Sequence, residues 1–335
     1  MAAEGHPPLG RDRRLSHRRD ADVSSPHDEG EDHAGPPGCA GDRNGVARRV
    51  RRHPGGRPMI DSHVHLQYDG RIPGERVGIT AEQLVDRMNR EGIDKSVVLP
   101  IESPEVTTSL YTTEQVLECA YRYPERIVPL IHVDPRMRRA GEVIRYFATT
   151  HAIIRGFGEL VDGLAIDDEK RQVIYETCED LGLPLIFYGS SYSSFDDANL
   201  SGLELMLQKF PGLIFIGHGP RWWNGISADD DGSCGYPDGP VVEGGAADRL
   251  LQEYENMYAD LSAGSGYNAI TRDPEFTQGF LERNWKKLMF ATDYTRMGDP
   301  LPQIQWVRET PMTDEMREAI SDGNARRVFN IEDAV

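Results

Sequence analysis

The sequence is short of cysteine, of long apolar runs and of positive charge. Its cysteines, Cys39, Cys119, Cys178 and Cys234, are scattered without CxxC spacing, so neither a zinc knuckle nor a disulfide framework is indicated. No apolar run approaches the roughly 18 residues that span a bilayer, and the N-terminus has no apolar signal region. We therefore expect a cytoplasmic protein with no membrane partner. A net charge of −18 argues against a nucleic acid as partner, because phosphates require a basic surface.

The first 57 residues lack Phe, Tyr, Trp and Lys, but hold 11 Arg, 9 Gly and 6 Pro. Such a segment cannot bury enough apolar surface to offset its ordering entropy, so residues 1–57 are predicted to be a disordered tail. Its arginine clusters could instead form an arm that binds an anion, although acidic residues are interspersed among them. Alternatively, Met59 is the natural start of the chain. The folded domain is expected over residues 58–335.

From Met59 onward, short runs rich in Val and Ile alternate with amphipathic stretches. This alternation is typical of parallel strands joined by helices. Strands are predicted at Met59–Leu66, Lys95–Ile101, Ile127–Val133, Ile153–Glu159, Leu185–Tyr188, Leu213–His218, Met257–Leu261 and Leu288–Thr292. Helices are predicted at Ala81–Glu91, Glu114–Arg122, Arg138–Thr149, Asp168–Leu181, Leu203–Phe210, Gly245–Glu255, Glu275–Asn284 and Leu301–Thr310, with a last helix at Asp314–Val328.

Eight strand–helix units in one run indicate an α/β fold of the (β/α)8 TIM-barrel type, with a doubly wound sheet as the alternative. The connection Gly219–Gly244 is too long for an ordinary loop between a strand and a helix. Long loops at the carboxyl ends of barrel strands usually shape the active site, so this connection is expected to contribute to it.

The strongest chemical signal is His63-Val64-His65 on the first predicted strand. Residues i and i+2 of a strand point to the same face, so both imidazoles converge as the ligands of a zinc-type site do. An HxH motif alone is weak evidence, but this one follows Asp61 at the beginning of a barrel.

Further polar residues fall at the carboxyl ends of later predicted strands: Glu159, Tyr188, His218 and Asp293. Barrel enzymes keep their catalytic groups at these positions. Singly, each residue could equally cap the next helix. Together with the HxH motif on the same rim, they indicate a catalytic site. His132 and Asp134, after the third strand, are interpreted as part of a turn before Pro135.

These motifs resemble the amidohydrolase-related family of metal-dependent TIM-barrel hydrolases and decarboxylases. The resemblance covers nearly the whole span from Met59 to the end. It rests on Asp61–His65, Gly156–Glu159, Gly182–Pro184, Gly217–Gly219, Tyr258–Ser262, Phe290–Tyr294 and Gly323–Phe329. It implies that His63, His65 and Asp293 bind the metal, and that His218 is a ligand or a catalytic acid/base.

One position departs from the family. Relatives usually carry a ligand histidine at the end of the fifth strand, where this chain has Tyr188. A neutral phenol, with a pKa near 10, is a poor ligand. Either the metal lowers that pKa, or Glu159 supplies the missing donor as a fourth-strand carboxylate does in some related hydrolases. The remaining possibility is that metal affinity is weakened or lost.

The resulting hypothesis is a hydrolase that acts on an amide, lactone or related carbonyl compound through a metal-bound hydroxide. One divalent ion is expected, Zn2+ by default and Mn2+ or Fe2+ as alternatives. Asp293 would accept the water proton and His218 would stabilise the oxyanion. The small-molecule substrate would be held by Tyr188, Arg221, Trp222 and Asn224, unless the tryptophans only pack the long loop.

Two other functions fit the same sequence. The first is non-oxidative decarboxylation of an aromatic or enoic acid, with the same metal binding the substrate carboxylate. The second is a catalytically impaired homologue that acts as a binding protein. A homo-oligomer is compatible with all three hypotheses.

Overall fold

The computed structural model describes residues 57–66, 78–107, 110–233 and 235–332, which belong to one compact unit. Its parallel strands are β1 Ile60–Val64, β2 Lys95–Val98, β3 Ile127–Pro129, β4 Phe157–Leu160, β5 Leu185–Tyr188, β6 Phe215–His218, β7 Met257–Asp260 and β8 Leu288–Met289. Each overlaps a predicted strand. The predicted disordered tail, apart from Arg57, lies outside the described residues.

The strands close into a barrel. β1–β2–β3 and β4–β8 each form a continuous parallel sheet. The two sheets meet through a parallel bridge between Ile131 and Phe157, and again through one between Val64 and Tyr294. At the second junction the Asp293 amide donates to the His63 carbonyl (2.9 Å). A doubly wound sheet would leave β1 and β8 unpaired with each other, so the predicted TIM barrel is confirmed.

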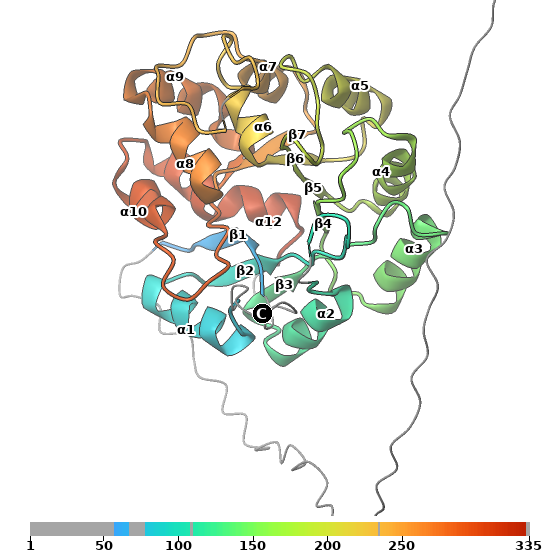
Figure 1. Cartoon of the computed structure of the whole chain (residues 1–335). Coiled ribbons are helices and arrows are strands. Elements are labelled where there is room, and N and C mark those ends of the chain that lie inside the picture. Colours follow the sequence, from blue (N-terminus) through green and yellow to red (C-terminus); the bar gives the residue numbers. More distant parts are fainter. Residues whose placement is uncertain (1–56, 67–77, 108–109, 234, 333–335) are drawn as a thin grey trace, which may run out of the picture. The chain divides into compact units, whose positions relative to one another are not determined.

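Helices surround the strands (Figure 1). They are α1 Ala81–Glu91, α2 Thr113–Arg122, α3 Ala140–Thr150, α4 Glu169–Leu181, α5 Ser201–Lys209, α6 Pro220–Asn224, α7 Ala246–Glu253, α8 Ala263–Thr271, α9 Pro274–Asn284, α10 Pro302–Glu309, α11 Asp314–Glu318 and α12 Asn324–Val328. Thr80 and Thr112 cap α1 and α2 through complete capping boxes, which fix where both helices begin.

Two hydrophobic clusters build the core. The larger one includes the outward sides of the strands and the helices packed on them, for example Val64, Ile131 and Phe215. The smaller one includes Ile60, Ile186, Ile216 and Met289 from the strands, with Phe329 and other residues of the C-terminal segment packed against them. The carboxyl ends of the strands carry polar residues instead.

The structure adds two helices that the sequence analysis did not anticipate, α6 and α8. The predicted last helix, Asp314–Val328, is helical, but residues Ala319–Gly323 form a π-helical segment between α11 and α12.

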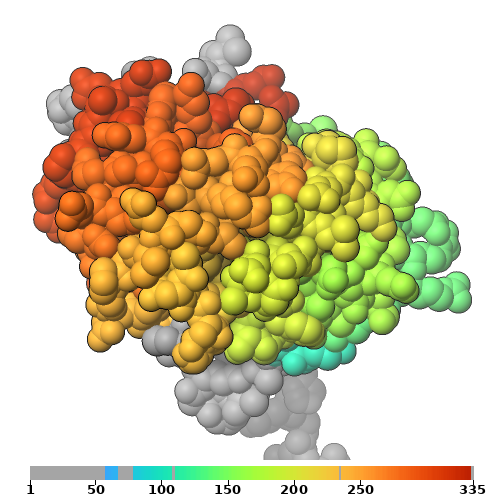
Figure 2. Space-filling view, turned by 90° about the horizontal axis from the view of Figure 1, so that it is seen from above, coloured from blue at the N-terminus to red at the C-terminus, as the bar shows by residue number. Residues whose placement is uncertain are grey.

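The yellow-green, orange and red parts of the chain pack into one continuous surface in Figure 2. Among the described helices, none combines the length and apolar character that a membrane span requires.

Candidate metal centre

Three imidazoles converge at the carboxyl ends of β1 and β6. The Nε2 atoms of His63 and His65 are 3.0 Å apart, and the ring of His218 lies 4.2 Å from that of His63, centroid to centroid. All three side chains are buried. The alternation of β1 turns both of its histidines to one face, as the HxH spacing predicts.

The outer nitrogens of these rings are all held by acceptors. His63 Nδ1 bonds Asp260 Oδ2 (2.8 Å), and His218 Nδ1 bonds Asp260 Oδ1 (2.9 Å). His65 Nδ1 donates to the Leu99 carbonyl (2.9 Å). For His63 and His65, a hydrogen on Nδ1 leaves the Nε2 lone pair turned toward the centre, which is how proteins orient metal-binding histidines.

Two carboxylates complete the cluster. Glu159 Oε2 lies 3.2 Å from His65 Nε2, and Glu159 Oε1 lies 3.4 Å from His218 Nε2. Asp293 Oδ1 lies 3.7 Å from His65 Nε2. Glu159 is buried, whereas the Asp293 side chain is 25% exposed.

The residues present fit a divalent cation. Burial opposes a charged imidazole, yet the carboxylates of Asp260 and Glu159 raise the pKa of His218 to about 10. Burial likewise opposes ionisation of Glu159, yet the three imidazoles lower its pKa to about 2. Lone pairs and carboxylates packed this closely require positive charge among them. Imidazole and carboxylate donors suit Zn2+, Mn2+ and Fe2+.

Asp61, next to the HxH motif, does not point at this cluster of donors. Its Oδ1 accepts from the Thr292 amide (2.9 Å) and its Oδ2 from the Thr292 hydroxyl (2.6 Å). Burial raises the pKa of Asp61 to about 7. The pair joins β1 to the segment after β8, and therefore positions Asp293 relative to the two histidines.

Tyr188 lies beside the donors, opposite His218 in the β5–β6 register. Its ring centroid is 5.7 Å from that of His218. Burial, with the neighbouring Tyr192 phenol and the Glu159 carboxylate, raises the pKa of Tyr188 well above its usual value. A phenol that keeps its proton is a hydrogen-bond donor to a ligand and a poor donor to a metal.

A family model described as Amidohydrolase matches residues 60–331. The chain belongs to the amidohydrolase family. This confirms the resemblance read from the motifs and the expectation of an enzyme. No curated protein matches this amidohydrolase significantly.

The solved structures that share its fold at low identity include the following three. An uncharacterised TIM-barrel protein from Bordetella bronchiseptica is 17% identical (TM-score 0.62; 82% of this chain and 98% of that chain covered). A 5-carboxyvanillate decarboxylase from Novosphingobium aromaticivorans, complexed with manganese and a nitrobenzoic acid, is 14% identical (0.57; 82% and 97%). A probable 2-pyrone-4,6-dicarboxylic acid hydrolase from Acinetobacter baumannii is 14% identical (0.55; 82% and 99%).

The other predicted substrate residues of this amidohydrolase belong to α6, which follows β6. Arg221 forms an ion pair with Asp230 of the long connection. Trp222 is fully buried, and a Cβ atom placed on Gly217 would lie 2.5 Å from its ring. Asn224 lines a cavity of about 140 Å³ together with Asp229 and other loop residues. The structure thus brings Tyr188 to the donors and places these three in the packing of the loop.

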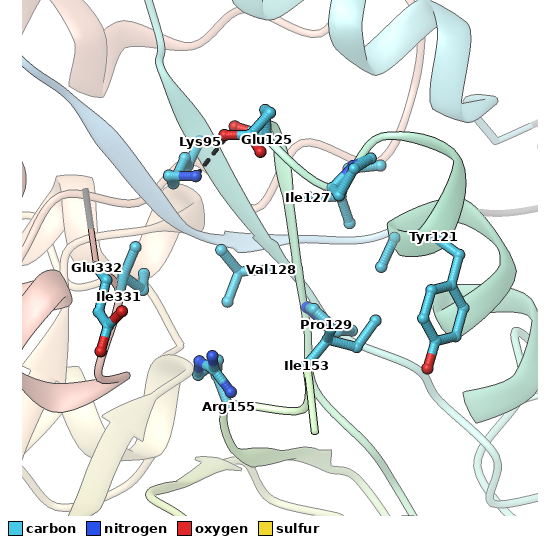
Figure 3. Close-up of a pocket in the computed structure, with 12 residues that line it drawn as sticks. Lys95, Tyr121, Glu125, Ile127, Val128, Pro129, Ile153, Arg155, Ile331 and Glu332 are labelled. Atoms are coloured by element: carbon cyan, nitrogen blue, oxygen red, sulfur yellow. Dashed lines mark hydrogen bonds between the residues drawn. The ribbon is translucent and has the colours of Figure 1, made fainter. Parts of the chain in front are cut away.

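A second hollow lies at the other end of the strands (Figure 3). This cavity of about 220 Å³ is lined by residues where β2 and β3 begin, including Lys95 and Ile127, and by Ile331 near the C-terminus. Lys95 donates to the Glu125 carbonyl (3.1 Å) there. The amino-terminal end of a barrel serves stability rather than catalysis, so the chemistry is assigned to the opposite end.

Proposed function

We propose that this amidohydrolase is a metal-dependent hydrolase of an amide, lactone or related carbonyl compound. One divalent ion, Zn2+ or Mn2+, would be held by His63, His65, Glu159 and Asp293. The observation that carries the proposal is the position of Glu159, with one oxygen 3.2 Å from His65 Nε2 and the other 3.4 Å from His218 Nε2. A carboxylate at that point is the donor that can replace the histidine missing at Tyr188.

The charge on Glu159 favours hydrolysis over decarboxylation. A second anionic ligand beside Asp293 leaves less positive charge on the cation, which weakens its hold on a substrate carboxylate. Decarboxylation depends on that hold. When bound, the cation supplies a polarised carbonyl and a water of lowered pKa, and both remain available with an anionic ligand set.

The protein's own groups then move the protons. Asp293, the most exposed carboxylate of the cluster, accepts a proton from the attacking water and delivers it to the leaving group. The raised pKa of His218 keeps a proton on both of its ring nitrogens. Its Nδ1 is oriented by Asp260 and by the Ser262 hydroxyl (2.9 Å), and its Nε2 donates to the oxygen that gains negative charge.

Decarboxylation is the second candidate, because the fold is shared with a 5-carboxyvanillate decarboxylase. The deciding experiment loads the purified protein with Zn2+ or Mn2+ and screens lactones, amides and hydroxybenzoates. Turnover of a lactone or amide, lost at least 100-fold in Asp293→Asn and retained in the matched control Asp299→Asn, supports the proposal. Release of CO2 from a hydroxybenzoate, without turnover of any ester or amide, would reverse it.

A further inference from the structure

Three tyrosines lie near the donors of the candidate metal centre. Tyr188 ends β5, Tyr192 lies in the loop after β5, and Tyr236 lies in the long connection after β6. The ring centroids of Tyr188 and Tyr192 are 5.7 Å apart. Tyr192 is 53% exposed and Tyr236 is 56% exposed, although both are large, partly apolar side chains.

A buried ion pair anchors the turn that carries Tyr192. Arg171 and Asp162 are fully buried, with Arg171 Nε 3.0 Å from Asp162 Oδ2. Arg171 also donates to the Ser194 hydroxyl (2.7 Å), and the Ser193 hydroxyl accepts from the Asp162 amide (3.0 Å). These bonds connect the turn that carries Tyr192 to the loop after β4 and to α4. They therefore restrict the movement of the backbone that carries the exposed ring.

Tyr236 packs against α8. A Cβ atom placed on Gly264, in the first turn of α8, would lie 3.1 Å from the Tyr236 ring. Burial and the nearby Asp293 carboxylate raise the pKa of Tyr236. Tyr236 thus stands on the Asp293 side of the site, whereas Tyr188 stands on the His218 side.

We propose that Tyr188, Tyr192 and Tyr236 form an aromatic mouth that selects substrates with a flat ring. Planar rings stack on phenol faces, and phenol hydroxyls donate to ring or carbonyl oxygens. The substrate class is accordingly an aromatic or unsaturated cyclic ester, lactone or amide rather than an aliphatic one. The inference rests on the proposed function, because it requires that substrate reach the donors past these rings.

The test compares an aromatic lactone, dihydrocoumarin, with an aliphatic one, δ-valerolactone, on metal-loaded protein. Tyr192→Leu and Tyr236→Leu should each lower the preference for dihydrocoumarin in kcat/KM about tenfold, mainly through KM. Tyr192→Phe should retain most of that preference, since it keeps the ring. The matched control is Tyr146→Leu, which removes a tyrosine of α3 that is 61% exposed. An unchanged preference in both leucine variants overturns the inference and leaves the proposed function standing.

A binding measurement distinguishes a failure of the aromatic mouth from a failure of the proposed hydrolysis. Dihydrocoumarin is titrated by calorimetry into metal-loaded Asp293→Asn protein, alone and combined with Tyr192→Leu. Binding that weakens about tenfold in the combined variant supports the mouth, even if the wild-type protein hydrolyses neither lactone. Absence of both binding and turnover overturns the mouth as well as the proposed hydrolysis.

Discussion

Asp260 is a buried carboxylate that contacts two imidazoles of the site through their outer nitrogens. It accepts from His63 and His218, and the Ser262 hydroxyl donates to it as well (2.6 Å). The sequence contained a signal for it, since Asp260 ends an apolar strand as Glu159 and His218 do. Its role was not foreseen, because the sequence alone does not show that the end of β7 lies beside His63 and His218.

Replacing this carboxylate should loosen the metal centre. Asp260→Asn retains size but accepts only one strong hydrogen bond, so one imidazole loses its orientation. We expect metal affinity to fall about 10- to 100-fold, measured by competition with a chromophoric chelator. The control is Asp248→Asn, which removes a buried carboxylate that bonds Asn284 (2.7 Å) and Arg283. Equal losses of affinity in both variants would contradict the orienting role.

His132 shows what burial does to an imidazole without partners. Its side chain is fully buried beside Phe157, and neither ring nitrogen has a hydrogen-bond partner in the described part of the chain. Burial lowers the pKa of His132 to about 4. The unfolded chain takes up this proton near pH 6.5, whereas the folded chain does so only near pH 4.

Acidification over that window should therefore favour unfolding. The unfolded state binds more protons between pH 6.5 and 4, so the His132 contribution to stability is fully present above pH 6.5 and declines toward pH 4. His132→Leu removes the contribution. The stability of the variant relative to the wild type should rise by up to about 3 kcal/mol between pH 7 and pH 4. The free energy of unfolding is measured by urea denaturation at each pH. A difference between the two proteins that stays constant from pH 7 to pH 4 would refute the assignment.

At the residue scale, the sequence predicted the positions that follow from strand periodicity. His63, His65, Glu159, His218 and Asp293 lie at or just after the carboxyl ends of strands, and the structure brings them into two groups that share His63. The tyrosines Tyr192 and Tyr236 escaped notice because they belong to loops, whose paths depend on tertiary contacts rather than on a repeating pattern.

At the scale of elements, local signals located most helices. The box at Thr80 predicted where α1 begins, and Gly182 adopts the left-handed conformation that ends α4. Helix α8 was missed because Gly264 and Gly266 have low helix propensity. Gly266 packs directly on the Leu261 backbone, a contact that only glycine permits. Tertiary packing therefore overrides propensity there.

The buried ion pair of Arg171 and Asp162 joins α4 to the loop after β4. Removing one partner should lower the free energy of unfolding more than replacing both partners with apolar residues. Arg171→Met leaves Asp162 buried without its cation, which should lower the free energy of unfolding by about 3–5 kcal/mol. The double variant Arg171→Met/Asp162→Leu removes both charges and should recover part of that loss. Urea denaturation of the three proteins measures this coupling. A double variant no more stable than the single one would show that the unpaired Asp162 charge does not cause the loss of stability.

At the scale of the whole molecule, the eight-unit pattern predicted the barrel but could not by itself exclude an open sheet. Closure depends on hydrogen bonds between residues more than 200 positions apart, such as the Ser62 amide to the Phe290 carbonyl (3.0 Å). No local pattern encodes such a pairing. The motif resemblance supplied that information, and the bridge between Val64 and Tyr294 confirms it.

The N-terminal tail is expected to be dispensable. Its composition, free of aromatic residues, supplies little apolar surface for packing on the barrel. Deleting Met1–Pro58 also removes the exposed ion pair between Arg57 and Asp314, which is worth at most about 1 kcal/mol. Melting temperature and metal content should stay unchanged. A melting temperature lowered by several degrees would show that the tail packs on the folded domain.

Metal removal should destabilise the whole barrel. The candidate ligands come from β1, β4 and the segment after β8, so a bound cation ties distant parts of the closed sheet together. A cation that binds only the folded state adds about 4 kcal/mol at a thousandfold excess over its Kd. In a protein of this size such a loss lowers the melting temperature by several degrees or more. Chelation should produce that shift in the wild type, and added Zn2+ or Mn2+ should reverse it. In His63→Ala/His65→Ala neither treatment should matter, because the two converging donors are gone. A melting temperature that responds to chelator equally in both proteins would place the stabilising cation elsewhere.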